Sequence, residues 1–267
     1  MNAFQLPLDA LKACEGWEAG NKNNPLAYAS LWHCKPPQSS QRLPVMQPGI
    51  DCTLAAGGNG AGKTILGAQL CAAILMGAND KSVQLWMKVN NVHPDLIPPD
   101  GGTVLASSLN AQLSIHVQRA SIRKYLPPGT EWRNPGGPGT SVAWLPNGNK
   151  CVFLTNDSGA RSYQGMSAAC VWMDEEHDES VYNEALQRVS RFRWKTPTGQ
   201  NKSGFLFLTM TPLKGLNSWV YRRFVENPDH GTRVHYIFGG DNPHIDHQRE
   251  ASSRAAFEEA SENRTLR

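Results

Sequence analysis

Short apolar runs along the chain alternate with longer segments in which apolar residues recur every three or four positions. The short runs predict strands at residues 52–56, 83–89, 103–107, 150–155, 169–174, 204–209 and 233–238. The longer segments predict helices at residues 63–76, 109–125, 179–192, 216–226 and 248–263. Strands that are separated by helices favour a parallel sheet covered on both faces. The pattern therefore predicts an α/β fold with a mostly parallel central sheet.

The apolar runs at residues 141–145 and 150–155 flank the sequence Pro-Asn-Gly-Asn, which predicts a hairpin appended to this sheet. Residues 1–49 are rich in Pro, Asn and Gln and form a predicted lead-in segment. The core is expected at residues 50–240. Residues 241–267 are expected to be a C-terminal linker helix, so that a small helical or linker part is appended to the core.

Composition supports a folded, soluble domain. Hydrophobic residues make up 40% of the 267 positions and charged residues 18%, which allows a sizeable core and argues against disorder. The net charge of +3 permits contact with nucleic acid without requiring it. No apolar run reaches the ~18 residues that a membrane span needs. The six cysteines form no C-x-x-C pair, so buried free thiols in an intracellular protein are expected.

The strongest chemical signal is a glycine-rich loop between the first predicted strand and the first predicted helix. It consists of Gly57, Gly58, Asn59, Gly60, Ala61, Gly62, Lys63 and Thr64, and it satisfies the phosphate-loop pattern G-x-x-x-x-G-K-[ST]. Glycines allow positive φ, so that backbone amides and the helix N-terminus face phosphates. We expect Lys63 to bridge the β- and γ-phosphates of ATP and Thr64 to hold Mg²⁺. The alternative is a glycine-rich turn before an ordinary helix, with no role in binding.

A second signal is the acidic end of the strand predicted at residues 169–174. Carboxylates at the carboxyl end of a parallel strand lie in the ligand crevice of such a sheet. Asp174 is expected to orient the Mg²⁺ ion, and Glu175 is expected to act as general base on the attacking water. A solvated loop is the alternative.

Four further residues are candidates for the same site. Thr209 and Thr211 follow a buried strand and are predicted to sense the γ-phosphate, or simply to end the strand before a proline. Arg161, in a Gly- and Ser-flanked segment, can stabilise transition-state charge in its own subunit or a neighbour's, or form a surface contact. Gln41 precedes the phosphate loop and can hydrogen-bond adenine, although most loop glutamines have no specific role.

In combination these motifs resemble the large subunit of the tailed-bacteriophage terminase. The resemblance rests on residues 57–64, the segment from Arg161 to Gly165, residues 171–176, residues 208–212 and the Gly-Asp-Asn-Pro-His run at residues 240–244. It covers residues 38–267. Many relatives have an arginine in the phosphate loop at the position of Asn59, and the departure here leaves Arg161 to supply that positive charge, or leaves the role vacant.

The resemblance implies a RecA-like (ASCE) ATPase that moves double-stranded DNA into a procapsid in the cytoplasm of an infected bacterium. It implies ATP and Mg²⁺ as cofactors, and a portal protein and a small terminase subunit as partners. It also implies a homo-oligomeric ring on the procapsid, with a monomer possible in solution, and no membrane. Relatives usually carry a C-terminal nuclease, but this chain ends near where that domain would begin, so no nuclease activity is expected.

Three other classes of protein remain as alternatives. A helicase or repair ATPase shares the phosphate loop, but a two-lobed helicase needs a second RecA-like domain for which no residues remain. A nucleotide-switched binding module would tolerate loss of Glu175, whereas a motor would not. A nucleoside kinase would need a substrate pocket and a lid, and the sequence contains no distinct signal for either.

Overall fold

The computed structural model describes Leu26, Ala27, Ala29 and residues 49–90, 92–134, 141–211 and 218–237. Four predictions concern residues outside this part of the chain. They are the lead-in segment apart from Leu26, Ala27, Ala29 and Gly49, the adenine contact of Gln41, the Asp-Asn-Pro run and the last predicted helix.

The described residues are built around one eight-stranded sheet with the order β10-β1-β9-β6-β2-β5-β4-β3. Its strands are β1 (Cys52–Gly57), β2 (Val104–Ser108), β3 (Glu131–Arg133), β4 (Ser141–Trp144), β5 (Lys150–Thr155), β6 (Cys170–Asp174), β9 (Phe205–Met210) and β10 (Thr232–Ile237). The pairs from β10 to β5 are parallel, whereas β4 pairs antiparallel with both β5 and β3. β9 lies between β1 and β6, so the strand that precedes the phosphate loop and the acidic strand are separated by one strand.

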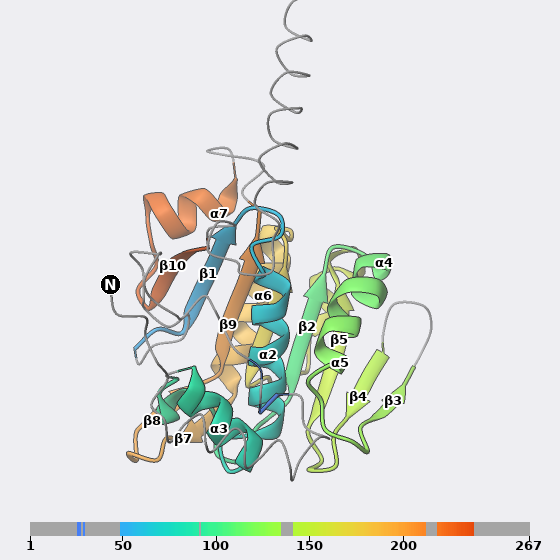
Figure 1. Cartoon of the computed structure of the whole chain (residues 1–267). Coiled ribbons are helices and arrows are strands. Elements are labelled where there is room, and N and C mark those ends of the chain that lie inside the picture. Colours follow the sequence, from blue (N-terminus) through green and yellow to red (C-terminus); the bar gives the residue numbers. More distant parts are fainter. Residues whose placement is uncertain are drawn as a thin grey trace, which may run out of the picture.

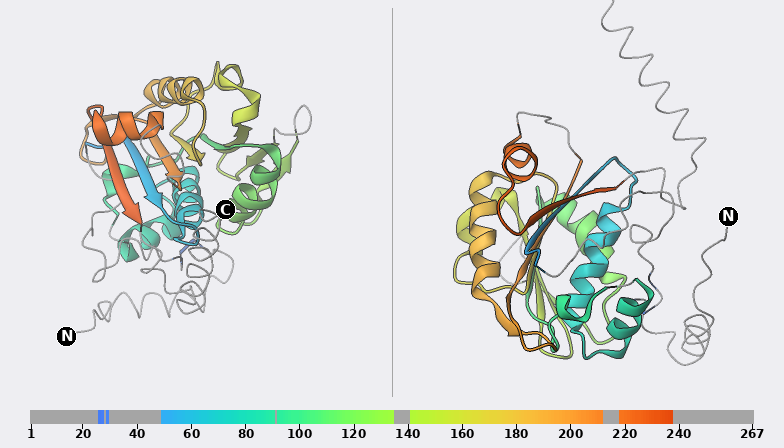
Figure 2. Two further views of the ribbon diagram at one scale, coloured as in Figure 1. Left: turned by 90° about the horizontal axis from the view of Figure 1, so that it is seen from above. Right: turned by 90° about the vertical axis from the view of Figure 1, so that its left-hand side faces the viewer.

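Helices cover both faces of the sheet (Figures 1 and 2). One face carries α2 (Lys63–Met76), α3 (Lys81–Val89) and a continuous helix made of α4 (Ala111–Leu113), the π-helical turn η3 (Ser114–Arg119) and α5 (Ala120–Arg123). The other face carries α6 (Glu179–Arg191), α7 (Trp219–Tyr221) and the π-helical turn η7 (Arg222–Glu226). Short 3₁₀ turns, η2 (Pro94–Leu96), η4 (Asn156–Ser158) and η5 (Ala160–Tyr163), and the hairpin of β7 (Arg193–Lys195) and β8 (Asn201–Ser203) complete the described elements. This arrangement confirms the predicted α/β class with a mostly parallel central sheet.

Each central strand contributes to two hydrophobic cores because successive side chains point to opposite faces of a sheet. In β6, Trp172 packs into the core beneath α2, whereas Val171 and Met173 pack into the core beneath α6. In β9, Phe207 packs into the core beneath α2 and Leu208 packs into the core beneath α6. The near-continuous apolar runs of the sequence are thus those of strands buried on both sides.

Helix α2 lies close against the sheet, and Gly67 permits this approach. All but Thr64 and Ile65 among its residues are buried, as expected of a helix enclosed between other elements. A Cβ atom on Gly67 would lie 2.2 Å from Cε2 of the Trp172 indole, so no side chain fits between this helix and β6. The helix ends at Met76, after which Gly77 has a φ of 86°.

The strand predicted at residues 83–89 is wrong, since these residues belong to helix α3. Asp80 caps the helix by accepting hydrogen bonds from the backbone amides of Ser82 (2.8 Å) and Val83 (3.3 Å). Val83, Trp86 and Met87 are buried with the three- and four-residue spacing of a helix. The run rich in Val, Leu, Trp and Met resembles a strand unless the cap is recognised.

The other predicted elements that lie in the described residues are present with small shifts at their ends. The hairpin of β4 and β5 is confirmed. The short edge strand β3 is an element that the sequence pattern did not predict. Cys52, Cys71, Cys151 and Cys170 are buried free thiols, as predicted. Among the described residues, no helix is long and apolar enough to span a bilayer.

The Gly67→Ala variant tests the close approach of α2 to the sheet. The new methyl group would collide with the Trp172 indole, and overpacking of this kind costs about 1–3 kcal/mol, which corresponds to a Tm lower by roughly 3–10 °C. Thermal unfolding followed by circular dichroism measures the change. Ser180→Ala, at an exposed position of α6, is the control and should leave Tm within about 1 °C of wild type. An unchanged Tm for Gly67→Ala would contradict the packing described here.

Candidate active site at the carboxyl edge of the sheet

The glycine-rich loop leaves β1 at the carboxyl edge of the sheet and leads directly into α2. Gly60 and Gly62 have φ values of 76° and 88°, which the sequence pattern anticipates and which only glycine adopts freely. A Cβ atom on Gly57 would lie 2.3 Å from the carbonyl oxygen of Ile237 in the neighbouring strand β10. The loop therefore presents backbone amides and the N-terminus of α2 together, which is the arrangement that binds phosphate in proteins.

Lys63, the first residue of α2, is folded back over this loop. Its Nζ donates to the carbonyl oxygens of Gly57 (2.9 Å) and Gly58 (2.8 Å) and to the hydroxyl of Thr211 (3.1 Å). The side chain is 7% exposed, and burial lowers the pKa of its ammonium group, while the charges of Glu175 and Asp174 oppose that shift. The ammonium group is therefore held among oxygen atoms that an incoming phosphate can replace.

Asp174, the last residue of β6, is fixed by the adjacent strand. It lies opposite Thr209 in the register of β6 with β9. The Thr209 hydroxyl donates to Oδ1 of Asp174 (2.6 Å) and accepts a hydrogen bond from the Trp172 indole (2.8 Å). Burial raises the pKa of Asp174 to about 6, against the Thr209 hydrogen bond, which lowers it. A carboxylate that is costly to ionise in isolation gains most from a nearby cation.

Glu175 is the one non-glycine residue of the described chain with positive φ, at 71°. Its backbone amide donates to the carbonyl oxygen of Thr209 (2.7 Å). Its carboxylate accepts from the backbone amide of Thr211 (3.0 Å) and lies 3.4 Å from the Thr211 hydroxyl. A left-handed conformation costs an ordinary residue of order 1–3 kcal/mol and persists only where surrounding contacts enforce it.

Thr211 joins the two halves of the site. Its hydroxyl lies within hydrogen-bond distance of Lys63, of Asn59 Oδ1 (3.3 Å) and of Glu175. Since Lys63 can only donate, the hydroxyl accepts from Lys63 and directs its own proton to Asn59 or Glu175. The structure thus brings together the phosphate loop, the acidic strand end and Thr211, which lie far apart in the sequence.

The oxygen donors beside the phosphate loop fit a magnesium ion. Thr64, the second residue of α2, is half-buried, and Asp174 supplies a carboxylate. Within the described residues, no group of three or more His, Cys, Asp or Glu side chains forms a metal cluster. Mg²⁺ is commonly held by one or two protein oxygens together with substrate phosphates and water, so the donor set suits a nucleotide-bound magnesium ion.

Other predicted site residues lie in different surroundings. Thr209 is fully buried behind Asp174, with its hydroxyl engaged by Asp174 and Trp172. Arg161 is exposed on η5, and its guanidinium makes no hydrogen bond or ion pair with any described residue. The contacts of Trp172 with Thr209 and of His177 with the Glu175 carbonyl were not anticipated, because no motif marks them.

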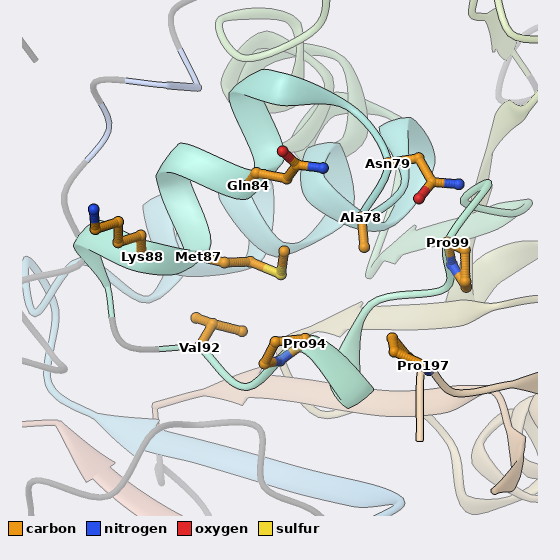
Figure 3. Close-up of a pocket in the computed structure, with 9 residues that line it drawn as sticks. All are labelled: Ala78, Asn79, Gln84, Met87, Lys88, Val92, Pro94, Pro99 and Pro197. Atoms are coloured by element: carbon orange, nitrogen blue, oxygen red, sulfur yellow. The ribbon is translucent and has the colours of Figure 1, made fainter. Parts of the chain in front are cut away.

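A separate hollow of about 430 Å³ lies between α3 and Pro197, at the other end of α2 (Figure 3). It is lined mainly by aliphatic and proline carbons, with Met87, Val92, Pro94 and Pro99 among them. Helix α2 has 14 residues, so roughly 20 Å separate its two ends, and the hollow plays no part in the site at the phosphate loop.

The amino-acid sequence is similar to those of viral terminase large subunits. A family model described as "Terminase large subunit, T4likevirus-type, N-terminal" matches residues 54–264. The terminase large subunit of Salmonella phage P22 is 34% identical over 84 residues, which is 32% of this chain and 15% of that protein.

Two solved structures are similar to the described fold. The large terminase from a thermophilic bacteriophage, solved in complex with ADP, has a TM-score of 0.49 and 16% identity, over 92% of this chain and 48% of that chain. The large terminase ATPase domain of Thermus phage P74-26 has a TM-score of 0.45 and 12% identity, over 77% of this chain and 82% of that chain. The chain thus spans about half of the ADP-bound large terminase and matches a smaller part of the P22 protein. Because the family match extends over most of the sequence, the chain belongs to the family of terminase large subunits of the T4likevirus type, as their N-terminal part.

Proposed function

We propose that this chain is the ATP-hydrolysing motor domain of a viral terminase and that it drives double-stranded DNA into a procapsid. One observation carries the proposal: Thr211 links Lys63 of the phosphate loop to Glu175 beside Asp174, at the carboxyl edge of a parallel sheet. A cation for phosphate, a carboxylate for a metal and a second carboxylate for water are what ATP hydrolysis requires. Membership of the terminase family then points to DNA packaging.

The proposed nucleotide-binding element is the phosphate loop, residues 57–64. Its amides would surround the phosphates, and Lys63 would exchange the carbonyl oxygens of Gly57 and Gly58 for phosphate oxygens. The positive φ values of Gly60 and Gly62 support this role, because turns of this kind let successive backbone amides point toward an anion. Gln41 remains the candidate for the adenine contact.

Mg²⁺ is the proposed metal cofactor, and Thr64 and Asp174 are the residues that would hold it. When bound, it would neutralise phosphate charge and orient the terminal phosphate. Thr209 holds the Asp174 carboxylate in place through its hydrogen bond, so we infer that Thr209 acts through Asp174 and not by direct contact with nucleotide.

Glu175 is the proposed general base. Its carboxylate accepts a hydrogen bond from the Thr211 amide and lies near the Thr211 hydroxyl, which also contacts Lys63. Loss of the γ-phosphate would change the partners of Lys63, and Thr211 would pass that change to Glu175 and to the end of β9. Such a response to loss of the γ-phosphate would be the sensor role predicted for Thr211.

The proposed partners follow from the family alone. They are double-stranded DNA, a portal protein and a small terminase subunit, with a homo-oligomeric ring on the procapsid and a monomer in solution, in the cytoplasm of the bacterial host. The described residues contain no candidate for a two-metal nuclease centre. A nucleotide-switched binding module is the alternative, and turnover that depends on Glu175 discriminates between them.

The first test of the site is Lys63→Ala. Removing the ammonium leaves the phosphate charge without its nearest cation, so ATP turnover should fall at least ~10²-fold. Phosphate release from MgATP by the purified chain measures it, with Lys88→Ala, at an exposed position of α3, as a matched lysine control. Wild-type turnover by Lys63→Ala would rule out the phosphate-loop assignment.

The second test separates binding from chemistry. Glu175→Gln should bind MgATP normally but hydrolyse it at least ~10²-fold more slowly, as expected for the loss of a general base. The matched control is Glu176→Gln, the next residue along, which should keep turnover within about threefold of wild type. Should Glu176→Gln prove to be the crippling change, the general base has been misassigned by one residue.

The third test concerns Arg161 as a finger that reaches into a neighbouring subunit. Its exposed side chain on η5 and the absence of an arginine in the phosphate loop motivate the idea. A finger in trans contributes about 10³–10⁵ in rate in other phosphate-loop enzymes. Arg161→Ala and Glu175→Gln subunits, each inactive alone, should therefore partly restore hydrolysis when mixed, because one supplies the finger and the other an intact site.

Two outcomes would reject this role of Arg161. One is a mixture that stays inactive although both variants assemble. The other is full-rate hydrolysis by dilute wild-type monomer, for which turnover is expected to rise more than linearly with protein concentration. Arg161 would then be an ordinary surface residue.

A further inference from the structure

A chain of buried polar side chains lies behind Glu175, on the side away from the phosphate loop. His177 lies within 2.9 Å of the Glu175 carbonyl oxygen through Nδ1 and within 2.7 Å of the Ser107 hydroxyl through Nε2. The Tyr163 hydroxyl donates to Ser107. His177 is 2% exposed, and Ser107 and Tyr163 are fully buried. Three elements, β2, η5 and the turn after β6, thus meet at the backbone of the proposed general base.

The direction of every proton in this chain is fixed by the groups at its ends. A carbonyl oxygen can only accept, so the hydrogen on the His177 ring lies on Nδ1. Nε2 of the neutral ring then accepts from Ser107, whose oxygen accepts in turn from Tyr163. Burial lowers the pKa of His177, against its contacts with the backbone of Glu175 and Ser108 and the charge of Asp178, which keeps the ring neutral. Burial also raises the pKa of Tyr163 to about 12, so its hydroxyl remains a donor.

The His177 backbone is held as well. Its carbonyl oxygen accepts from the Trp219 indole (2.8 Å), and Gln118 donates to the carbonyl oxygen of Ser107 (3.0 Å). Rotation of the ring within this fixed frame would break both of its buried hydrogen bonds, to the Glu175 carbonyl oxygen and to the Ser107 hydroxyl. An ordinary packing histidine needs none of this, and His235 of β10 illustrates the contrast: it is equally buried, yet its Nδ1 has no hydrogen-bond partner among the described residues.

The backbone that His177 contacts is the strained one. Glu175 has a left-handed φ, and its carboxylate direction follows from that conformation. Of its backbone groups, the amide is held by Thr209 of β9 and the carbonyl by His177. Release of the carbonyl would let the residue relax toward an ordinary conformation and turn its carboxylate away from Thr211.

We propose that His177 is a positioning residue for ATP hydrolysis: by donating from Nδ1 to the Glu175 carbonyl, it holds the general base in its strained, productive conformation, and Ser107 and Tyr163 lock its ring. The inference rests on the proposed function, since it assumes that Glu175 acts on the attacking water. The chain ends on η5, the turn that carries Arg161, so the base and the segment proposed to face a neighbouring subunit are tied together.

Two substitutions of similar polarity separate the donor from the rest of the ring. The amide nitrogen of His177→Asn lies as many bonds from Cβ as Nδ1, and that of His177→Gln lies as many bonds as Nε2. His177→Asn should keep kcat within about threefold of wild type, whereas His177→Gln should lower it at least ~10-fold, since small misplacements of a catalytic group cost up to ~10². KM for ATP should stay within about twofold for both, because Lys63 and the phosphate loop are untouched.

The measurement is steady-state hydrolysis of MgATP by the 267-residue chain at one protein concentration, with Tm recorded for each variant. His235→Asn is the matched control, a buried histidine with no part in the chain, and it should leave kcat unchanged even if it lowers Tm. Tyr163→Phe should lower kcat about threefold or more, with KM unchanged. Added to His177→Gln, it should cause no further loss, because it acts through the same ring.

The outcomes separate this inference from the proposed function. If wild type hydrolyses ATP and Glu175→Gln abolishes it, but both His177 variants have equal kcat, the positioning role is overturned and the motor assignment stands. If wild type does not hydrolyse ATP, both fall. If His177→Gln does not fold, Tyr163→Phe decides alone: a reduced kcat with unchanged KM supports the role, and wild-type kcat overturns it.

Discussion

The buried ammonium group of Lys63 is the constraint around which the carboxyl edge of the sheet is arranged. A buried charge costs several kcal/mol unless polar groups surround it. Here the surrounding groups come from three places: the carbonyl oxygens of Gly57 and Gly58, the hydroxyl of Thr211 and the nearby carboxylates of Asp174 and Glu175. Parallel strands alone bring these groups together, since β1, β9 and β6 all end at the same edge. The lysine proposed to bind phosphate and the carboxylates proposed to act on metal and water therefore lie in a single site.

The two acidic residues at the end of β6 differ because the backbone turns between them. Asp174 continues the strand and pairs with Thr209, and its partial burial raises its pKa. Glu175 turns into a left-handed conformation and directs its carboxylate toward Thr211 instead. One residue of separation thus gives two carboxylates with different surroundings, which matches a division between metal binding and proton transfer.

Much of the fold was readable from the sequence, for reasons that also explain the failures. The apolar runs of β1, β6 and β9 and the pattern of the phosphate loop are local features of the sequence. They therefore predicted both the strands and the candidate site residues that follow them. The error at α3 arose because the apolar run was weighed without the Asp80 cap. The partners of Thr209 and His177 depend on strand register and on contacts between β2, β6 and η5, which no local pattern contains.

We propose that Lys63, Thr64, Asp174 and Glu175, at the carboxyl edge of the sheet, form a site for magnesium and ATP. Calorimetric titration of the chain with ATP-γ-S, in Mg²⁺ and in EDTA, tests it most directly. We expect one binding site per chain, with affinity at least ~10-fold lower in EDTA, because the metal screens phosphate charge beside two carboxylates. Absence of binding, or an affinity that does not depend on Mg²⁺, would contradict it.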